Sequence, residues 1–326
     1  MSLRTELYQI AARHQLDGPT LQRLLQLGDL ETEPAGLEHW LPRGIAIFAA
    51  ALGGFGVILW IAANWETFGR FGRFGLLQTF VLATGIGALL RPAGRAPLGL
   101  LSLLGIGGLF AYFGQTYQTG ADPWQLFALW AALALPLCLA LRSDVLWAPW
   151  ALVVSTGVSL WVHAHIGHRW HFSTEDLPAH TAGWLASLLL VLWLGPLCQR
   201  FSGAGVWSLR TAITLCLGTF SFLALCGLFD HDVSLHYWLG LIATLLLAAV
   251  SASRQAFDIY GVSLAALSFN TLLVCGISRL LLHNSDSHDI LGHLMLIGLV
   301  AAGMLAATVT LVLKLYRRHT AEEHAA

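Results

Sequence analysis

The residues best placed to do chemistry lie in a polar stretch, Phe110 to Leu126, that separates two long apolar runs. It reads FAYFGQTYQTGADPWQL and carries amides, phenols and a carboxylate, but neither Lys nor Arg. A second polar segment, after the first apolar run, adds an amide, a carboxylate and an arginine. Together these groups suit a pocket for a small polar ligand. The predicted ligand-binding residues are Asn64, Trp65, Glu66, Arg70, Gln115, Tyr117, Gln118, Asp122 and Trp124.

Two other interpretations of these residues stay open. The polar groups also suit mutual hydrogen bonds and helix caps at a membrane interface, where polar residues cost little. Glu66 and Asp122 could act as an acid and a base, but nothing in their surroundings selects that role. No nucleophilic triad and no Gly-rich phosphate loop accompanies them. We therefore predict no catalytic residues, and the chain is expected not to be an enzyme.

Histidine forms the second candidate constellation. Ten of the 14 histidines fall in three polar segments between apolar runs, together with several aspartates. Imidazole and carboxylate are ligands for zinc, copper or nickel, so a divalent metal site is possible, although no other cofactor is predicted. The spacing of these histidines matches no defined metal motif. The alternative to a metal site is a polar loop that happens to contain histidines. The residues proposed for metal are His163, His165 and His168.

Long apolar runs must position these residues. Of the 326 residues, 56% are hydrophobic and 11% charged, less than half the charge of a soluble domain. Because about 20 apolar residues span a bilayer as a helix, and strand-like alternation is absent, we predict an all-α polytopic transmembrane helical bundle. The expected spans, about ten, are Gly44–Asn64, Phe74–Leu90, Leu98–Phe113, Pro123–Leu141, Val145–Val162, Ala182–Leu197, Leu209–Phe229, His236–Ser251, Phe257–Leu282 and Ile290–Leu313.

The distribution of Lys and Arg predicts the orientation. With a cytoplasmic N-terminus, 13 of these residues lie in inner segments and 4 in outer ones, as the positive-inside rule requires. Both termini are then cytoplasmic. Both polar loops of the predicted pocket, and the histidine-rich loops, fall outside.

Three regions are expected along the chain. Residues 1–42 form a short cytoplasmic helical hairpin and an acidic linker, because two leucine-bearing stripes at helical spacing precede an acidic segment. Residues 43–145 hold the first four spans with the two polar outer loops. Residues 146–326 hold the remaining spans with the histidine-rich loops. The first span is expected to act as an uncleaved targeting signal, since no secretory signal peptide is visible.

The same spacing between a tryptophan and an aspartate occurs twice in the sequence. Trp124 and Asp144 are separated by 20 residues, and Trp238 and Asp258 repeat this spacing 114 residues later. An internal repeat would explain it, as in many membrane proteins. Two matched pairs also arise by chance in apolar sequence, so both explanations stay open.

Short motifs resemble a known family. They are Trp60-Ile-Ala-Ala-Asn64-Trp65-Glu66, Tyr117-Gln-Thr-Gly120-Ala-Asp122 and Leu126-Phe-Ala-Leu-Trp130. They are similar to the domain of unknown function family 2157, over about residues 5–145. The N-terminal segment is shorter than expected for the family. The resemblance implies a bacterial inner-membrane protein with a neighbouring membrane protein as partner, and it implies no activity.

These observations lead to one functional expectation. The protein is predicted to be a non-enzymatic scaffold or sensor in an envelope complex, with its outer polar face as the ligand or partner surface. The alternatives are a transporter of a small polar solute and, third, a membrane-embedded enzyme. Few ionisable residues interrupt the apolar runs, which weighs against an ion-coupled transporter. Its expected partners are the lipid bilayer and another inner-membrane protein, and a net charge of −1 argues against nucleic acid.

Overall fold

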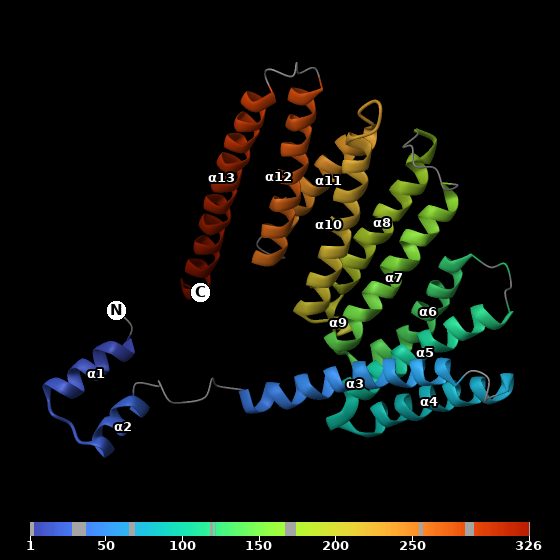
Figure 1. The fold of residues 1–326 in the computed structure, drawn as a ribbon, viewed down its shortest axis with the longest axis horizontal. Helices are drawn as coiled ribbons and strands as arrows, with labels where there is room; N and C mark the ends of the chain where they lie inside the picture. Colours follow the sequence, from blue (N-terminus) through green and yellow to red (C-terminus); the bar gives the residue numbers. More distant parts are fainter. Residues whose placement is uncertain are drawn as a thin grey trace. The chain divides into compact units, whose positions relative to one another are not determined.

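In the computed structural model every regular element of the described residues is a helix, which confirms the predicted all-α fold (Figure 1). The structure describes residues 3–27, 37–64, 69–117, 120, 122–166, 174–253, 257–283 and 290–325. The chain divides into two compact units, Met1–Leu52 and Gly53–Ala326. The three predicted regions stay a prediction.

The first unit contains the predicted hairpin. Helix α1 (Leu3–Arg13) packs against α2 (Gly18–Leu27), and α3 (Leu37–Ala63) begins in this unit. Gln15 takes a positive φ of 48° in the turn between α1 and α2. The acidic segment 28–36 lies outside the described residues.

The second unit contains the rest of α3 and the remaining helices. In chain order these are α4 (Arg70–Leu90), η1 (Pro92–Gly94), α5 (Arg95–Tyr117), α6 (Pro123–Leu141), α7 (Asp144–His165), η2 (Thr174–Asp176), α8 (Leu177–Leu194), α9 (Gln199–Ser202), α10 (Val206–Leu228), α11 (Leu235–Ser251), α12 (Ile259–Leu282) and α13 (Ile290–Ala325). Nine of the described helices are long and apolar enough to cross a membrane: α3 to α8, α10, α12 and α13. The shorter α11 has 17 residues and corresponds to the short eighth span expected from the sequence.

Several predicted loops are shorter than expected. The third span was expected to end at Phe113, but α5 continues to Tyr117, while α6 begins at Pro123 as expected. His163, His165 and His180 were assigned to loops, and they lie in α7 and α8. The prediction was wrong because hydropathy falls before the helix ends: the backbone hydrogen bonds of a helix continue into the polar interface.

Glycines and tryptophans make the contacts that hold neighbouring helices together from α4 to α7. A Cβ on Gly105 would lie 2.8 Å from Val81, and one on Gly107 would overlap the ring of Trp130, so α5 approaches both neighbours closely. The Trp130 indole N–H then donates to the Leu103 carbonyl at 2.9 Å. The Trp150 N–H donates to the Ala131 carbonyl at 2.9 Å and joins α7 to α6.

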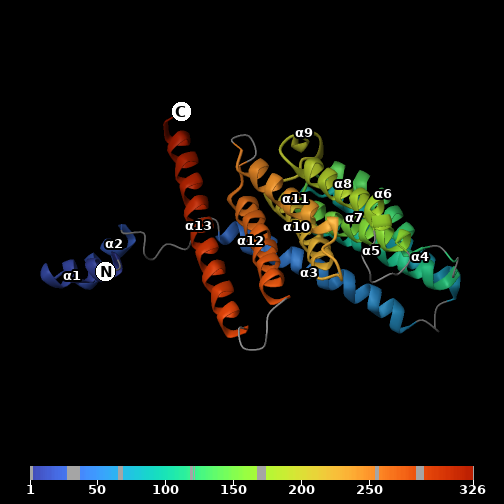
Figure 2. The same cartoon turned by 90° about the horizontal axis from the view of Figure 1, so that it is seen from above.

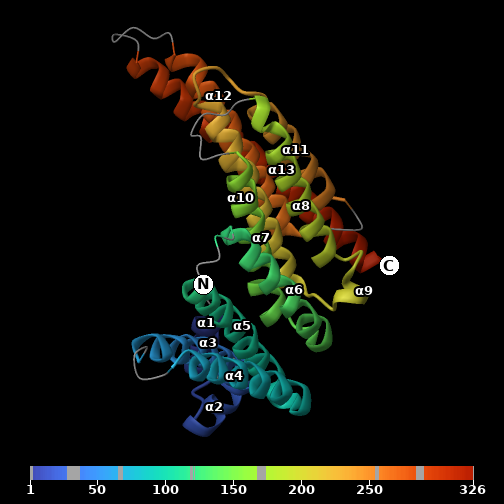
Figure 3. The same ribbon diagram turned by 90° about the vertical axis from the view of Figure 1, so that its right-hand side faces the viewer.

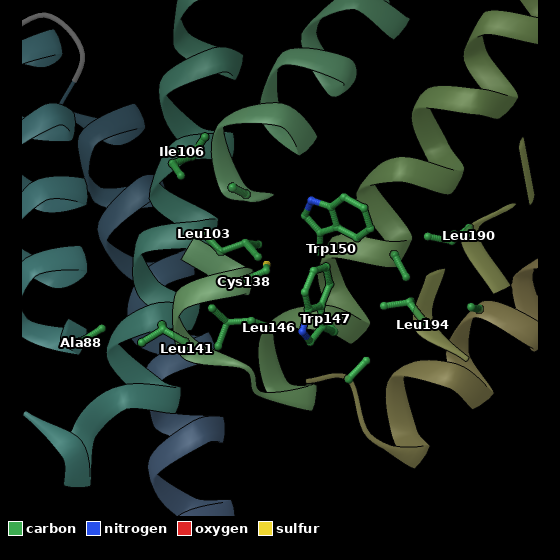
Figure 4. Close-up of a cluster of buried hydrophobic side chains, with 14 residues drawn as sticks. Ala88, Leu103, Ile106, Cys138, Leu141, Leu146, Trp147, Trp150, Leu190 and Leu194 are labelled. Carbon is green, nitrogen blue, oxygen red and sulfur yellow. The ribbon is translucent and has the colours of Figure 1, made fainter. Parts of the chain in front are cut away.

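A core cluster lies between these helices and α8. It brings together Leu103 of α5, Cys138 of α6, Trp147 and Trp150 of α7, and Leu194 of α8 (Figure 4). The rings of Trp147 and Trp150 meet edge to face with centroids 5.2 Å apart. Such contacts add to the packing of apolar side chains within the membrane.

Helix α10 organises the second half of the unit. It packs against α7, α8, α11 and α12, and α12 packs against α13 (Figures 1 and 3). The α10–α11 turn lies at the end of the unit where α7 finishes and α8 begins. We call this the histidine end, because it holds His163 and His165 of α7, His180 of α8 and His236 of α11. The connection from α11 to α12 and the short α9 lie at the opposite end (Figure 2).

Candidate functional site

The residues predicted to form the ligand pocket lie at the ends of α3 to α6. The side-chain amide of Asn64, directly after α3, donates to the Trp60 carbonyl one turn earlier at 2.9 Å. Trp65, Glu66 and Gln118 lie outside the described residues. Arg70 begins α4, and its side chain is likewise outside.

The other members of the predicted pocket sit around the α5–α6 connection. Gln115 and Tyr117 are in the last turn of α5, and Asp122 is the N-cap residue of α6. Asp122 accepts a hydrogen bond from the Trp124 indole at 3.4 Å. The Tyr117 ring lies 6.0 Å from the ring of Phe74 on α4. That contact brings the beginning of α4 to the end of α5, while a joint ligand pocket stays a prediction.

The histidines proposed for metal binding lie in and beyond the last turn of α7. The His165 ring packs over Trp161, with centroids 4.2 Å apart, and its Nδ1 is 2.8 Å from the Trp161 carbonyl oxygen. His163 is exposed, and His168 is outside the described residues. In the part of the chain that the structure describes, no three His, Cys, Asp or Glu side chains are grouped to hold a metal ion. Metal binding by these histidines stays a prediction.

A different pair of histidines is buried at the histidine end. His180 and His236 are 1% and 0% exposed, and the Nδ1 of His180 lies 3.0 Å from the Nε2 of His236. Their rings are nearly perpendicular, at 88°. Since one ring nitrogen must donate and the other accept, at least one imidazole of this pair is neutral. The hydrogen bond joins α8 directly to α11.

The first turn of α11 holds His236 in place. Ser234 is the N-cap residue of α11, and its hydroxyl oxygen lies 2.7 Å from the Nδ1 of His236. Both ring nitrogens of His236 therefore have partners. Gly227 of α10 permits this arrangement, because a Cβ there would lie 3.0 Å from the Cβ of His236.

A polar hollow of about 350 Å³ lies at the α10–α11 turn, beside His236. Hydrogen-bonding groups dominate its lining, and the volume suits a small ligand or a few side chains of a partner. The Arg279 guanidinium of α12 donates to the His231 carbonyl at 2.9 Å and ties the turn to α12. The hollow is lined by Leu177, Asp230, His231, Asp232, Val233, Ser234, Leu235 and His236.

No motif or spacing in the sequence indicates this pair directly. His180 and His236 belong to two different histidine-rich segments, and each lies in the first turn of an apolar helix. That shared position is the feature that could have linked them. Their contact across 56 residues exists because α8 and α11 both pack on α10.

Comparison with known protein families finds a match in the first part of the chain. Residues 9–147 match the family described as predicted membrane protein (DUF2157). This confirms the resemblance. The DUF2157 region ends at the beginning of α7, so it contains all the predicted pocket residues from Asn64 to Trp124 but neither His180 nor His236. No curated protein and no solved structure matches the chain.

Proposed function

We propose that this membrane protein is a non-enzymatic sensor or scaffold of the bacterial inner membrane. Its ligand or partner binds at the histidine end, which the Lys and Arg distribution assigns to the outer side, with both termini cytoplasmic. The observation that carries the proposal is the polar hollow at the α10–α11 turn, whose lining includes His236 of the buried His180–His236 pair.

The hollow favours a ligand with positive charge or hydrogen-bond donors. Asp230 and Asp232 supply carboxylates to its lining, and His231 and Ser234 supply further polar atoms. A small cation-bearing solute fits this lining, and so does a basic side chain of a partner protein. In either case the carboxylates would form charge-assisted hydrogen bonds with the bound group.

The histidine pair could transmit ligand binding in the hollow to the contact between α11 and α8. A group in the hollow would contact Ser234, whose hydroxyl oxygen lies 2.7 Å from the Nδ1 of His236, and His236 is in turn hydrogen-bonded to His180 on α8. Binding that changes the hydrogen bonds of His236 would therefore alter how strongly α11 holds α8. This coupling suits a sensor or an assembly factor.

A binding role fits the hollows better than transport does. Two further hollows in the described part of the chain, one between α6, α7 and α8 and one between α7, α8 and α10, are lined mainly by apolar side chains. A transporter of a polar solute needs polar groups along its path through the bilayer.

Photo-crosslinking tests the proposal. A photoreactive amino acid replaces Val233, which lines the hollow, or Leu245, which is exposed in the middle of α11. In living cells we expect a discrete adduct, identified by mass spectrometry as a solute or a protein, from position 233. It should weaken at least tenfold when Asp230 and Asp232 are both changed to Asn. Equal labelling at 233 and 245, or no adduct at 233, would contradict the proposal.

A further inference from the structure

The hydrogen bond between His180 and His236 links α8 to α11 through two groups that titrate near neutral pH. Nδ1 of His180 lies 3.0 Å from Nε2 of His236, and both side chains are at most 1% exposed. At this separation only one hydrogen fits between the two nitrogens. If both nitrogens carried hydrogen, two N–H groups would face each other and the hydrogen bond would be lost.

The closed pair has room for one added proton. The Ser234 hydroxyl lies 2.7 Å from Nδ1 of His236 and can accept a hydrogen bond from it when that nitrogen is protonated. Asp176, the N-cap residue of α8, is 9% exposed, and its carboxylate lies close enough to compensate one positive charge on the pair. A second proton would place two charged imidazoles against each other in a buried site. The closed pair therefore binds at most one added proton.

Other charged and titratable groups of the described residues lie around the pair on the neighbouring elements. Carboxylates among them favour a proton on the pair, whereas the guanidinium opposes it. Neither kind changes the number of hydrogens that fit between the facing nitrogens. These groups are Glu175 of η2, His163 of α7, Cys226 of α10, Asp230, His231 and Asp232 of the α10–α11 turn, and Arg279 of α12.

Separating the two imidazoles removes the limit. In water each imidazole takes a proton of its own below about pH 6.5. His236 lines the polar hollow, so water has a route to the pair once α11 moves. The separated state then binds at least one proton more than the closed pair. Because acid favours the state that binds more protons, each pH unit below this value increases the separated fraction by about tenfold per extra proton.

We propose that the His180–His236 pair makes the contact between α8 and α11 acid-sensitive. In acid both imidazoles are protonated, their hydrogen bond is lost, and α11 separates from α8 at the histidine end. Both helices also pack on α10, so the separation is local. The response requires no ligand in the hollow and does not depend on the proposed function.

Hydrogen–deuterium exchange measured by mass spectrometry tests the proposal on the full chain in lipid nanodiscs. Exchange is compared at about pH 7.5 and about pH 5.5, on either side of the imidazole value, after correction for the intrinsic rate. Residues 235–241 at the beginning of α11 report the contact. Residues 298–306 of α13, which packs on α12, are the internal reference. We expect the protection of α11 to fall at least tenfold in acid while that of α13 is unchanged.

Two variants test the histidines separately. In His180→Asn a side-chain amide atom takes the place of Nδ1, and in His236→Gln one takes the place of Nε2, so both keep a hydrogen bond with one titrating group fewer. The acid-induced loss in each should be about tenfold smaller than in the wild type. His283→Asn changes an exposed histidine at the end of α12 and should respond like the wild type.

Two results would overturn the proposal. One is a loss of protection in His180→Asn or His236→Gln as large as that of the wild type. The other is a wild type in which α11 loses no more protection than α13. Since either variant suffices, failure of one to fold still leaves the comparison with the other.

Discussion

Asp144 shows how much one carboxylate contributes at the end opposite the histidines. It begins α7, but its oxygens accept hydrogen bonds from the first turn of α10. Oδ1 accepts from the Gly205 N–H at 2.7 Å and from the Ser208 hydroxyl at 2.6 Å, and Oδ2 accepts from the Trp207 N–H at 3.2 Å. A negative charge at a helix N-terminus is also favoured by the helix dipole. Asp144 therefore caps a helix that begins more than 60 residues later.

Replacing Asp144 should destabilise the second unit. In Asp144→Ala the amides of Gly205 and Trp207 lose their acceptor, and we expect the free energy of unfolding to fall by about 2 kcal/mol. Reversible unfolding in mixed micelles measures it. Asp122 is the control, because it also occupies an N-cap position but its side chain makes no capping hydrogen bond. Equal losses for Asp144→Ala and Asp122→Ala would refute the argument.

At the scale of helices, α10 is held by close approach and by a few polar contacts. Asp258, the N-cap residue of α12, accepts from the Arg210 guanidinium of α10 at 2.8 Å. Asp144 and Asp258, the aspartates of the two Trp–Asp pairs with equal spacing, thus both bind the beginning of α10. Asn270 of α12 donates to the Thr308 hydroxyl of α13 at 2.8 Å, an interhelical bond within apolar surroundings.

The contact between α10 and α11 depends on a glycine. A Cβ on Gly240 would overlap the Cβ of Ala224, so Gly240→Leu must push the helices apart. We expect the free energy of unfolding to fall by roughly 3 kcal/mol, since overpacking a close contact costs about 1–3 kcal/mol. Gly298→Leu meets open space and should change it little. Thermal unfolding of both variants measures the difference, and the prediction fails if they melt together.

For the whole molecule, the number of crossings sets the topology. The nine long helices alone would place the termini on opposite sides of the membrane, whereas a tenth crossing by α11 would return them to one side, as the Lys and Arg distribution predicts. Its 17 residues span about 25 Å as a helix, at the lower limit for a bilayer. It lies between α10 and α12 and packs against both, which suits a crossing helix.

Cysteine labelling tests this topology. With the five native cysteines replaced by alanine, Asp232→Cys marks the α10–α11 turn and Ala93→Cys marks the α4–α5 connection. Asp232→Cys should react with an impermeant maleimide in intact spheroplasts. Ala93→Cys should react only after lysis, because the Lys and Arg distribution places it inside. The reverse pattern, or reaction of both before lysis, would reject the orientation.

The sequence by itself determined the helices and their membrane class. Insertion depends on the summed hydropathy of consecutive residues, which is a local property, so runs such as Pro123–Leu141 could be located to the residue. Helix ends were less accurate: α5 continues to Tyr117, beyond the expected Phe113, because polar interface residues remain helical. The motifs around Asn64 and Asp122 also sufficed to find the DUF2157 family.

Only the tertiary structure decided which polar groups meet. The bonds from Asp144 to Gly205 and from His180 to His236 join residues 61 and 56 positions apart. Hydropathy does not predict these contacts, because an apolar helix face is about as stable against lipid as against another apolar helix. Helix pairing is set instead by close contacts, such as Gly240 against Ala224, and by scattered hydrogen bonds. The buried histidine pair exists because those contacts place α8 and α11 on the same helix, α10.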